Sequence, residues 1–389
     1  MFRLQNPGAG DTRQAPVARA HHTDESTFGF NTRAWRLLFC LLTLALSGFT
    51  SACKNPLPLF RPETPEPLEN PEPQPPLERF EFTRPQMGVP FRIVLYGPDE
   101  ATATLAAEAA FARVEELNAI LSDYETDSEL NELSRTAGEG RSVSLSPDLW
   151  AVLHRAQDLA RLTGGAFDVT VAPAANLWRR ARRLNAMPDP ERLARARGLV
   201  GHEKLYLNPR QRTARLFLPG MSLDLGGIAK GYAIDEALLI LRQHGLPRAL
   251  VAAGGDTVVG DPPPGRDSWR VEVTALDVPN APPVQFLTLA NAAVATSGDL
   301  FQRLEIDGKR YSHIVDPRTG IGLTDRSLVT VVAPDGITAD SLATAVSVLG
   351  PEEGLQLIKN TPGTAAYIVR QPRDEIEVIA SENWPGNPD

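Results

Sequence analysis

The chain has 389 residues, which exceeds twice the roughly 150 residues of an average domain, so it is long enough to bury a large core. Apolar residues make up 42% and charged residues 22%, as is typical of soluble globular proteins. The formal charge of −9 and an aromatic content of 6% exclude a general nucleic-acid binder, which needs basic and base-stacking surfaces. Two cysteines are too few for a disulfide framework, and Cys40 and Cys53 do not have the spacing of a Cys-x-x-Cys metal site.

Residues 1–52 have the layout of an export signal that follows a long leader. A basic stretch at residues 33–36 precedes the apolar run Leu37–Phe49, and small residues follow it. This order is typical of export signals, and the apolar run is shorter than the ~20 residues that a membrane-spanning helix needs. We therefore expect residues 1–52 to direct export of the protein.

Cys53 follows the small residues and would be the first residue after cleavage. Because Cys40 would leave with the signal, Cys53 would be the single cysteine of the mature chain. A cysteine in this place resembles the lipobox of bacterial lipoproteins, which implies a lipid on its thiol and a membrane-anchored protein facing the periplasm. Two alternatives are ordinary cleavage after Ala52, which leaves a free thiol, and an uncleaved short anchor.

Residues 53–80 are predicted to form a lipid-anchored, proline-rich stalk. Residues 54–80 contain nine prolines in 27 residues, interleaved with glutamate. Proline fixes φ and lacks an N–H donor, so the stretch favours an extended polyproline II conformation of ~3 Å per residue. The alternative is a proline-rich recognition ligand for another protein.

Residues 81–389 have the pattern of one folded domain. Helices are predicted at Ala101–Leu121, Pro147–Leu162, Ile228–His244, Thr338–Leu349 and Glu352–Lys359. Strands are predicted at Phe91–Tyr96, Ala249–Ala253, Trp269–Thr274, Gln285–Ala290, Tyr311–Val315, Leu328–Val332, Ala365–Val369 and Ile376–Ile379. Strands that follow one another without intervening helices cannot be parallel crossovers. We expect an α+β fold with a largely antiparallel sheet and flanking helices. The arginine-rich stretch Arg179–Leu199 is predicted to be a solvated helical excursion without an assigned function.

His313 is the histidine with the richest polar surroundings, in residues 311–320. It lies on a predicted strand that is followed at once by a turn, a place that suits proton transfer. The alternative is a core histidine that is hydrogen-bonded to the backbone.

Four further segments are polar or glycine-rich where a plain core would be apolar, namely Thr163–Asp168, Leu223–Gly231, Ala252–Asp256 and Ala339–Thr344. Glycines let a ligand approach the backbone closely, and Lys230 at a helix start suits a phosphate. Taken singly, each segment also has a structural explanation. Two glycines after a helix often only cap it, and Asp340 alone would be a helix-start residue.

In this combination and order, the segments resemble the ApbE family. The resemblance rests on Met87–Phe91, Leu121–Tyr124, Ser128–Leu130, the four segments above, Thr296–Asp299 and His313. It covers roughly residue 81 to the C-terminus. The family consists of FAD:protein FMN transferases, typically exported bacterial lipoproteins, and it implies a single α+β body related to the T-fold. It also implies Mg²⁺-dependent transfer of FMN from FAD to a threonine of a membrane redox protein, with release of AMP.

The resemblance implies specific roles for single residues. Flavin contacts fall on Met87, Tyr124, Gly165, Ala166, Phe167, Asp224, Lys230 and Ile314. Metal ligands fall on Asp340, Thr344 and the backbone carbonyl of Gly227. Asp340 and Thr344 are i and i+4, so on a helix they point the same way, and an all-oxygen ligand set suits Mg²⁺. His313 is the candidate base for the acceptor threonine, with Asp299 as its partner.

Other functions use the same residues. An FAD pyrophosphatase would place water where the threonine attacks and would yield FMN and AMP. A flavin-binding lipoprotein would carry out no chemistry, and a purely structural surface lipoprotein leaves the polar segments unexplained. The joint presence of His313, Asp340 and Thr344 favours an enzyme, because binding alone needs no base. The choice between transferase and hydrolase stays open at this point, because the acceptor is another protein.

Overall fold

A computed structural model describes residues 76–273, 285–298, 303–372 and 375–386. All of them belong to one unit, Pro71–Asp389. The expected export signal, Cys53 and the stalk up to residue 75 lie outside the described residues. Strand β1 (Glu78–Gln86) includes the last residues of the expected stalk, because it pairs along its whole length with β2 (Val89–Gly97).

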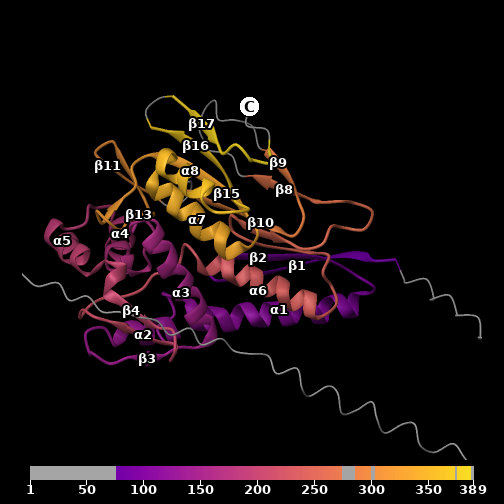
Figure 1. The fold of residues 1–389 in the computed structure, drawn as a ribbon, viewed down its shortest axis with the longest axis horizontal. Helices are drawn as coiled ribbons and strands as arrows, with labels where there is room; N and C mark the ends of the chain where they lie inside the picture. The colour runs from indigo at the N-terminus through magenta and orange to yellow at the C-terminus, as the bar shows by residue number, and fades with distance from the viewer. Residues whose placement is uncertain (1–75, 274–284, 299–302, 373–374, 387–389) are drawn as a thin grey trace, which may run out of the picture. The chain divides into compact units, whose positions relative to one another are not determined.

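An eight-stranded sheet forms the centre of the fold (Figure 1). Its order is β1-β2-β6-β7-β10-β15-β16-β17, and every neighbouring pair is antiparallel. The remaining strands of this sheet are β6 (Ala249–Ala253), β7 (Asp256–Val259), β10 (Ala292–Gly298), β15 (Arg326–Ala333), β16 (Ala365–Gln371) and β17 (Glu377–Ala380). The predicted α+β fold with a largely antiparallel sheet is confirmed.

Helices cover one face of this sheet. They are α1 (Glu100–Leu121), α6 (Ala229–Gln243), α7 (Gly336–Leu349) and α8 (Pro351–Lys359). Helices α1 and α6 lie side by side, and α6 in turn packs against α7 (Figure 1). Together with the sheet they enclose the main hydrophobic core.

The opposite face of the sheet is covered by the hairpin β8 (Trp269–Val273) and β9 (Gln285–Leu289). Successive strand residues point to opposite faces, so Ile93 belongs to the core under the helices while Val94 belongs to this second core. The sheet is therefore buried on both faces.

The segments between α1 and α6 add several shorter elements. Their helices are α2 (Glu129–Arg135), α3 (Pro147–Leu162), α4 (Ala172–Leu184) and α5 (Pro190–Leu199), with 3-10 turns η1 (Val169–Val171) and η2 (His202–Lys204). Their strands are β3 (Val143–Ser144), β4 (Leu205–Asn208) and β5 (Thr213–Leu216). Buried residues of α2, α3, β4 and β5 belong to the main core as well. Two further pairs follow later in the chain, β11 (Arg303–Ile306) with β12 (Lys309–Ser312) and β13 (Val315–Asp316) with β14 (Ile321–Gly322).

The prediction of a solvated excursion over Arg179–Leu199 is wrong in part. The stretch spans two helices, which are separated where Asn185 adopts a left-handed conformation with φ of 47°. Ala181 and Ala196 are buried in a third core together with Trp178, whose indole N–H donates to the Gly320 carbonyl. Only part of the arginine-rich surface therefore faces solvent.

Within the described ranges, no helix combines the length and the apolar character that crossing a membrane requires.

Candidate active site

A cavity of about 1130 Å³ brings most of the predicted site residues together. It is lined by Met87, Tyr124, Ala166, Phe167, Asp224, Gly227, Lys230, His313, Ile314, Asp340 and Thr344, among others. Its volume is slightly above the ~300–1,000 Å³ of most small-molecule sites, so it has room for a large ligand. Asp299 lies outside the described residues, and Gly165 is not among the lining residues.

One wall of the cavity is the turn between β1 and β2. Gln86 pairs with Val89, so Met87 and Gly88 form a two-residue hairpin loop. Both have positive φ, 47° for Met87 and 76° for Gly88, as a type I′ turn demands. A non-glycine residue in this conformation is uncommon. The tight turn places Met87 at the cavity.

Tyr124 lies in the loop between α1 and α2. The Ser122 hydroxyl accepts hydrogen bonds from the backbone N–H groups of Tyr124 and Glu125, which holds the loop in a turn. The Tyr124 side chain is 73% exposed although it lines the cavity. An accessible aromatic ring at a cavity wall suits stacking on a flat ligand.

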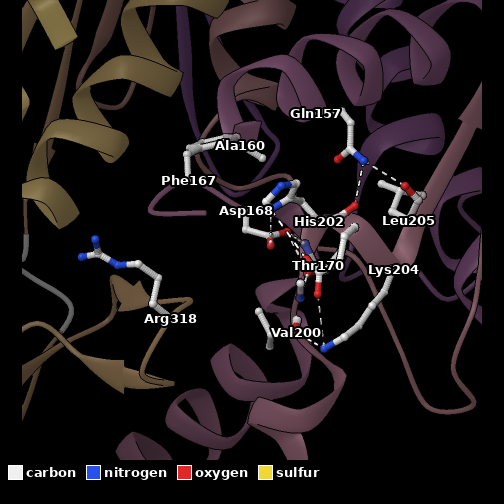
Figure 2. A network of polar contacts seen from close by, with 12 residues as sticks. Gln157, Ala160, Phe167, Asp168, Thr170, Val200, His202, Lys204, Leu205 and Arg318 are labelled. Carbon is white, nitrogen blue, oxygen red and sulfur yellow. Dashed lines mark hydrogen bonds and ion pairs between the residues drawn. The ribbon is translucent and has the colours of Figure 1, made fainter. Parts of the chain in front are cut away.

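The segment Ala166–Asp168 forms another wall, and a polar network supports it from behind (Figure 2). Asp168 Oδ1 accepts hydrogen bonds from the backbone N–H and the hydroxyl of Thr170, at 2.8 and 2.7 Å. His202 Nδ1 lies 3.9 Å from Asp168 Oδ2, and Gln157 donates to the carbonyls of His202 and Leu205. Burial raises the pKa of Asp168, although the hydrogen bonds from Thr170 act in the opposite direction.

Gly165 acts at the end of α3 rather than in the cavity wall. Its N–H donates to the Ala160 carbonyl at 2.8 Å, and its φ is +79°, which is the geometry of a helix C-terminal cap. A side chain at this position would approach His202. Gly165 is therefore not among the lining residues, and its contact with the flavin stays a prediction.

The crossing of α6 and α7 brings the expected metal ligands together. A Cβ atom on Gly227 would lie 2.8 Å from the Thr344 hydroxyl oxygen, so only glycine fits here without a shift. The backbone N–H of Gly231 donates to Asp340 Oδ2 at 3.1 Å. Gly227, Asp340 and Thr344 therefore face one small space beside the start of α6.

Asp340 is not a helix-start residue, so this structural explanation for its presence is wrong. Helix α7 begins at Gly336 and is capped by Asp335, whose side chain accepts from the Thr338 N–H. Both hydrogen bonds to Asp340 end on Oδ2, from Gly231 and Lys230. A carboxylate in the second turn of a helix, 5% exposed, has no role as a cap.

The donor set at this place fits Mg²⁺. Carboxylate, hydroxyl and carbonyl oxygens are hard ligands, which Mg²⁺ prefers. The described residues contain no cluster of three or more His, Cys, Asp or Glu side chains that would hold a metal by themselves. The remaining ligands would have to come from water or from the substrate phosphates.

Lys230 lines the cavity and also contacts two carboxylates. Its Nζ atom is 2.6 Å from Asp256 Oδ2 and 3.5 Å from Asp340 Oδ2. Burial by itself lowers the pKa of Lys230, but the negative charges of Asp256 and Asp340 outweigh it and raise the pKa, so the ammonium is charged. Any contact with a phosphate is therefore shared with these carboxylates.

His313 lies in a bend between β12 and β13, so the predicted continuous strand Tyr311–Val315 is interrupted. The Ser312 hydroxyl accepts from the Ile314 N–H at 3.0 Å, which closes the bend around His313. The imidazole is half-buried and lines the cavity. His313 therefore follows the last residue of β12 and is not on a strand itself, and its role as a base stays a prediction.

The sequence reasoning passed over three charged groups of the cavity wall. Asp256 is 2% exposed and pairs with Lys230, and Asp123 and Arg179 form an ion pair beside Tyr124. Asp123 and Asp256 lie inside the segments that carried the resemblance, so a search for every charged residue in them would have found both. Arg179 lies outside those segments and had no such signal.

The sequence pattern that defines the ApbE family matches residues 87–368. The chain belongs to the ApbE family. This ApbE protein has curated relatives named FAD:protein FMN transferase. That of Haemophilus influenzae is 32% identical over 285 residues, covering 70% of this chain and 80% of the relative. That of Treponema pallidum is 32% identical over 306 residues, covering 74% and 84%.

Solved ApbE structures share the fold of this chain. A flavin transferase ApbE from Vibrio cholerae is 30% identical with a TM-score of 0.71, covering 79% of this chain and 98% of that one. The apo flavinyl transferase ApbE from Pseudomonas stutzeri is 28% identical with a TM-score of 0.69, covering 79% and 96%. The likeness spans nearly the whole of each solved protein.

Proposed function

We propose that this ApbE protein transfers FMN from FAD to a protein acceptor. The observation that carries the proposal is the cavity itself, which unites an accessible tyrosine, a charged lysine, a histidine and an oxygen ligand set. Relatives that match most of the chain bear the name of this activity.

The proposed acceptor is a threonine hydroxyl of a flavoprotein subunit in a membrane redox complex. The hydroxyl oxygen forms a bond to the phosphorus of the FMN half of FAD. The bond from that phosphorus to the bridging oxygen breaks, AMP leaves, and the hydroxyl proton passes to the imidazole of His313. His313 suits this role because it lines the cavity and a neutral imidazole is a good base near pH 7.

The proposed metal is Mg²⁺, held by Asp340, Thr344 and the Gly227 carbonyl. When bound, it would act as a Lewis acid that offsets the negative charge of the pyrophosphate. The charged ammonium of Lys230 adds a positive charge beside the same place. Tyr124 and Met87 offer an aromatic and a thioether surface to the flavin ring.

We further propose that the protein is exported and held at a membrane by a lipid on Cys53, facing the periplasm. The support is the order of basic, apolar and small residues before Cys53, followed by the proline-rich stretch.

The test of the activity is a mass measurement. The purified protein is incubated with FAD, Mg²⁺ and a fragment of a candidate acceptor, and the fragment should gain the mass of one FMN less one water. An acceptor with valine in place of its threonine is the control. Release of FMN and AMP without modification of the fragment would identify a pyrophosphatase, and bound but unchanged FAD would identify a carrier.

A further inference from the structure

We propose that Arg179 is a positioning residue that fixes the flavin wall of the cavity, by which we mean Asp123, Tyr124 and Asp224. The inference rests on the proposed function, because it assigns Arg179 to the binding of FAD. Arg179 comes from α4, in the stretch for which the sequence suggested no role.

The Arg179 guanidinium contacts all members of the flavin wall at once. Its Nη1 atom forms an ion pair with Asp123, and its Nη2 atom donates to Asp224 Oδ2 at 2.8 Å. Its Cζ atom lies 4.6 Å from the centroid of the Tyr124 ring. The side chains of Arg179, Asp123 and Asp224 are only 19%, 10% and 12% exposed. These contacts are thus shielded from water, which makes them stronger than surface ion pairs.

The contacts join three segments that are far apart in the sequence. Asp123 follows α1, Arg179 belongs to α4, and Asp224 precedes α6. The other oxygen of Asp224, Oδ1, accepts from the Gly226 N–H at 2.8 Å. Since Gly226 adjoins Gly227, Arg179 connects the wall that faces the flavin to the loop that faces the expected metal.

Electrostatics make the arrangement depend on an arginine. Burial and the charge of Asp224 raise the pKa of Asp123, and Arg179 opposes both effects. Without a cation, two half-buried carboxylates would repel each other and draw apart. A lysine would supply the charge, but only the planar fork of arginine contacts two carboxylates and lies on a ring at the same time.

Helix α4 has a second anchor besides these contacts. Its Trp178 is 1% exposed and donates to the Gly320 carbonyl. Loss of the Arg179 side chain should therefore alter the cavity more than the stability of the protein.

The test compares Arg179→Ala and Arg179→Lys with Arg180→Ala, an exposed arginine of the same helix. FAD binding is measured by flavin fluorescence without an acceptor, KM and kcat by transfer assays, and folding by thermal unfolding. We expect Arg179→Ala to weaken FAD binding about tenfold to a hundredfold, by analogy with residues that orient metal ligands through hydrogen bonds. KM for FAD should rise more than kcat falls. The FAD affinity of Arg179→Lys should be closer to that of Arg179→Ala than to that of the wild type. Arg180→Ala should bind FAD as the wild type does.

A double variant separates positioning from simple charge balance. Asp123→Asn in the Arg179→Ala protein removes the unpaired charge without restoring the fork, so FAD binding should remain weak. Full recovery in the double variant, or wild-type binding by Arg179→Ala, would overturn the proposal. If Arg179→Ala alone unfolds, FAD binding is measured on the double variant instead, because it lacks the unpaired carboxylate charge. A wild-type protein that binds no FAD would instead refute the proposed function, and this inference with it.

Discussion

The ammonium of Lys230 lies between two buried carboxylates, and this decides which charges the cavity offers to a pyrophosphate. Burial and the charge of Asp340 raise the pKa of Asp256 to about 7, although Lys230 acts in the opposite direction. The proposed Mg²⁺ would share Asp340 with the ammonium, so it should bind weakly without the additional oxygen ligands of the substrate. Affinity for the metal should therefore depend on the presence of FAD.

Asp340→Asn tests the metal site. An amide oxygen can still accept from the Gly231 N–H, so the free energy of unfolding should change by no more than about 1 kcal/mol. Loss of the carboxylate should abolish Mg²⁺-dependent transfer, measured as activity against Mg²⁺ concentration. Asp335→Asn is the matched control on the same helix, because asparagine caps as well as aspartate. Undiminished turnover by Asp340→Asn would mean that the metal is held elsewhere.

His313→Ala tests the proposed base. Transfer should slow by the ~10²–10⁴ of a lost acid–base group, while FAD binding should persist because the imidazole is not needed to hold the flavin. The measurements are single-turnover transfer and FAD fluorescence. His154→Ala, on the exposed side of α3, should have no effect on either. An unfolded His313→Ala protein would favour the alternative of a structural histidine.

The crossing of α6 and α7 shows how two elements build a site that neither contains alone. A Cβ atom on Gly231 would lie 2.2 Å from the Gly336 carbonyl oxygen. This close approach lets the Gly231 N–H reach Asp340 and places Gly227 against Thr344. The glycines of the predicted phosphate segment therefore serve helix packing as much as ligand access.

Gly231→Ala should push the two helices apart. We expect a loss of at least ~1–3 kcal/mol of unfolding free energy, the usual cost of overpacking, together with weaker Mg²⁺-dependent activity. Gly198→Ala in α5 is the control, because a Cβ atom there meets nothing within 4 Å and alanine favours a helix. The two variants are compared by chemical denaturation. Equal stability would show that α7 can shift away from α6 with little loss of unfolding free energy.

Over the whole molecule, the described cavity and cores belong to residues 76–386, whereas the proposed export and anchoring would depend on the segment before them. The proposed lipid on Cys53 is separated from this body by the proline-rich stretch. Catalysis and anchoring should therefore be separable.

Cys53→Ala should release the protein into the soluble periplasmic fraction and leave FMN transfer to a soluble acceptor unchanged. Cell fractionation followed by the transfer assay measures both properties. Cys40→Ala is the control, since Cys40 lies in the apolar run that is expected to be removed. A wild-type protein that is already soluble after cell breakage would contradict lipid anchoring.

The elements that the sequence predicted well carry their signals locally. Helix α3 runs from Pro147 to Leu162 as predicted, because Ser146 caps it, Pro147 occupies its first turn and glycines end it. Strands β7 and β10 were missed. The small residues of Ala292–Gly298 show no clear alternation, and this segment becomes a strand because β7 and β15 pair with it.

The site likewise combines features that depend on local sequence with features that depend on tertiary packing. The i and i+4 spacing of Asp340 and Thr344 is a local property, so it was visible in the sequence, and the resemblance to the ApbE family located most of the cavity wall. The partners of Lys230 were not visible, since Asp256 and Asp340 are 26 and 110 residues away. The contacts of Arg179 with Asp123 and Asp224 span 56 and 45 residues. Residue types and short spacings thus determined which chemistry is available, while only the packing of α4, α6 and α7 decided which charges meet, because ion pairs depend on distance in space and not on separation along the chain.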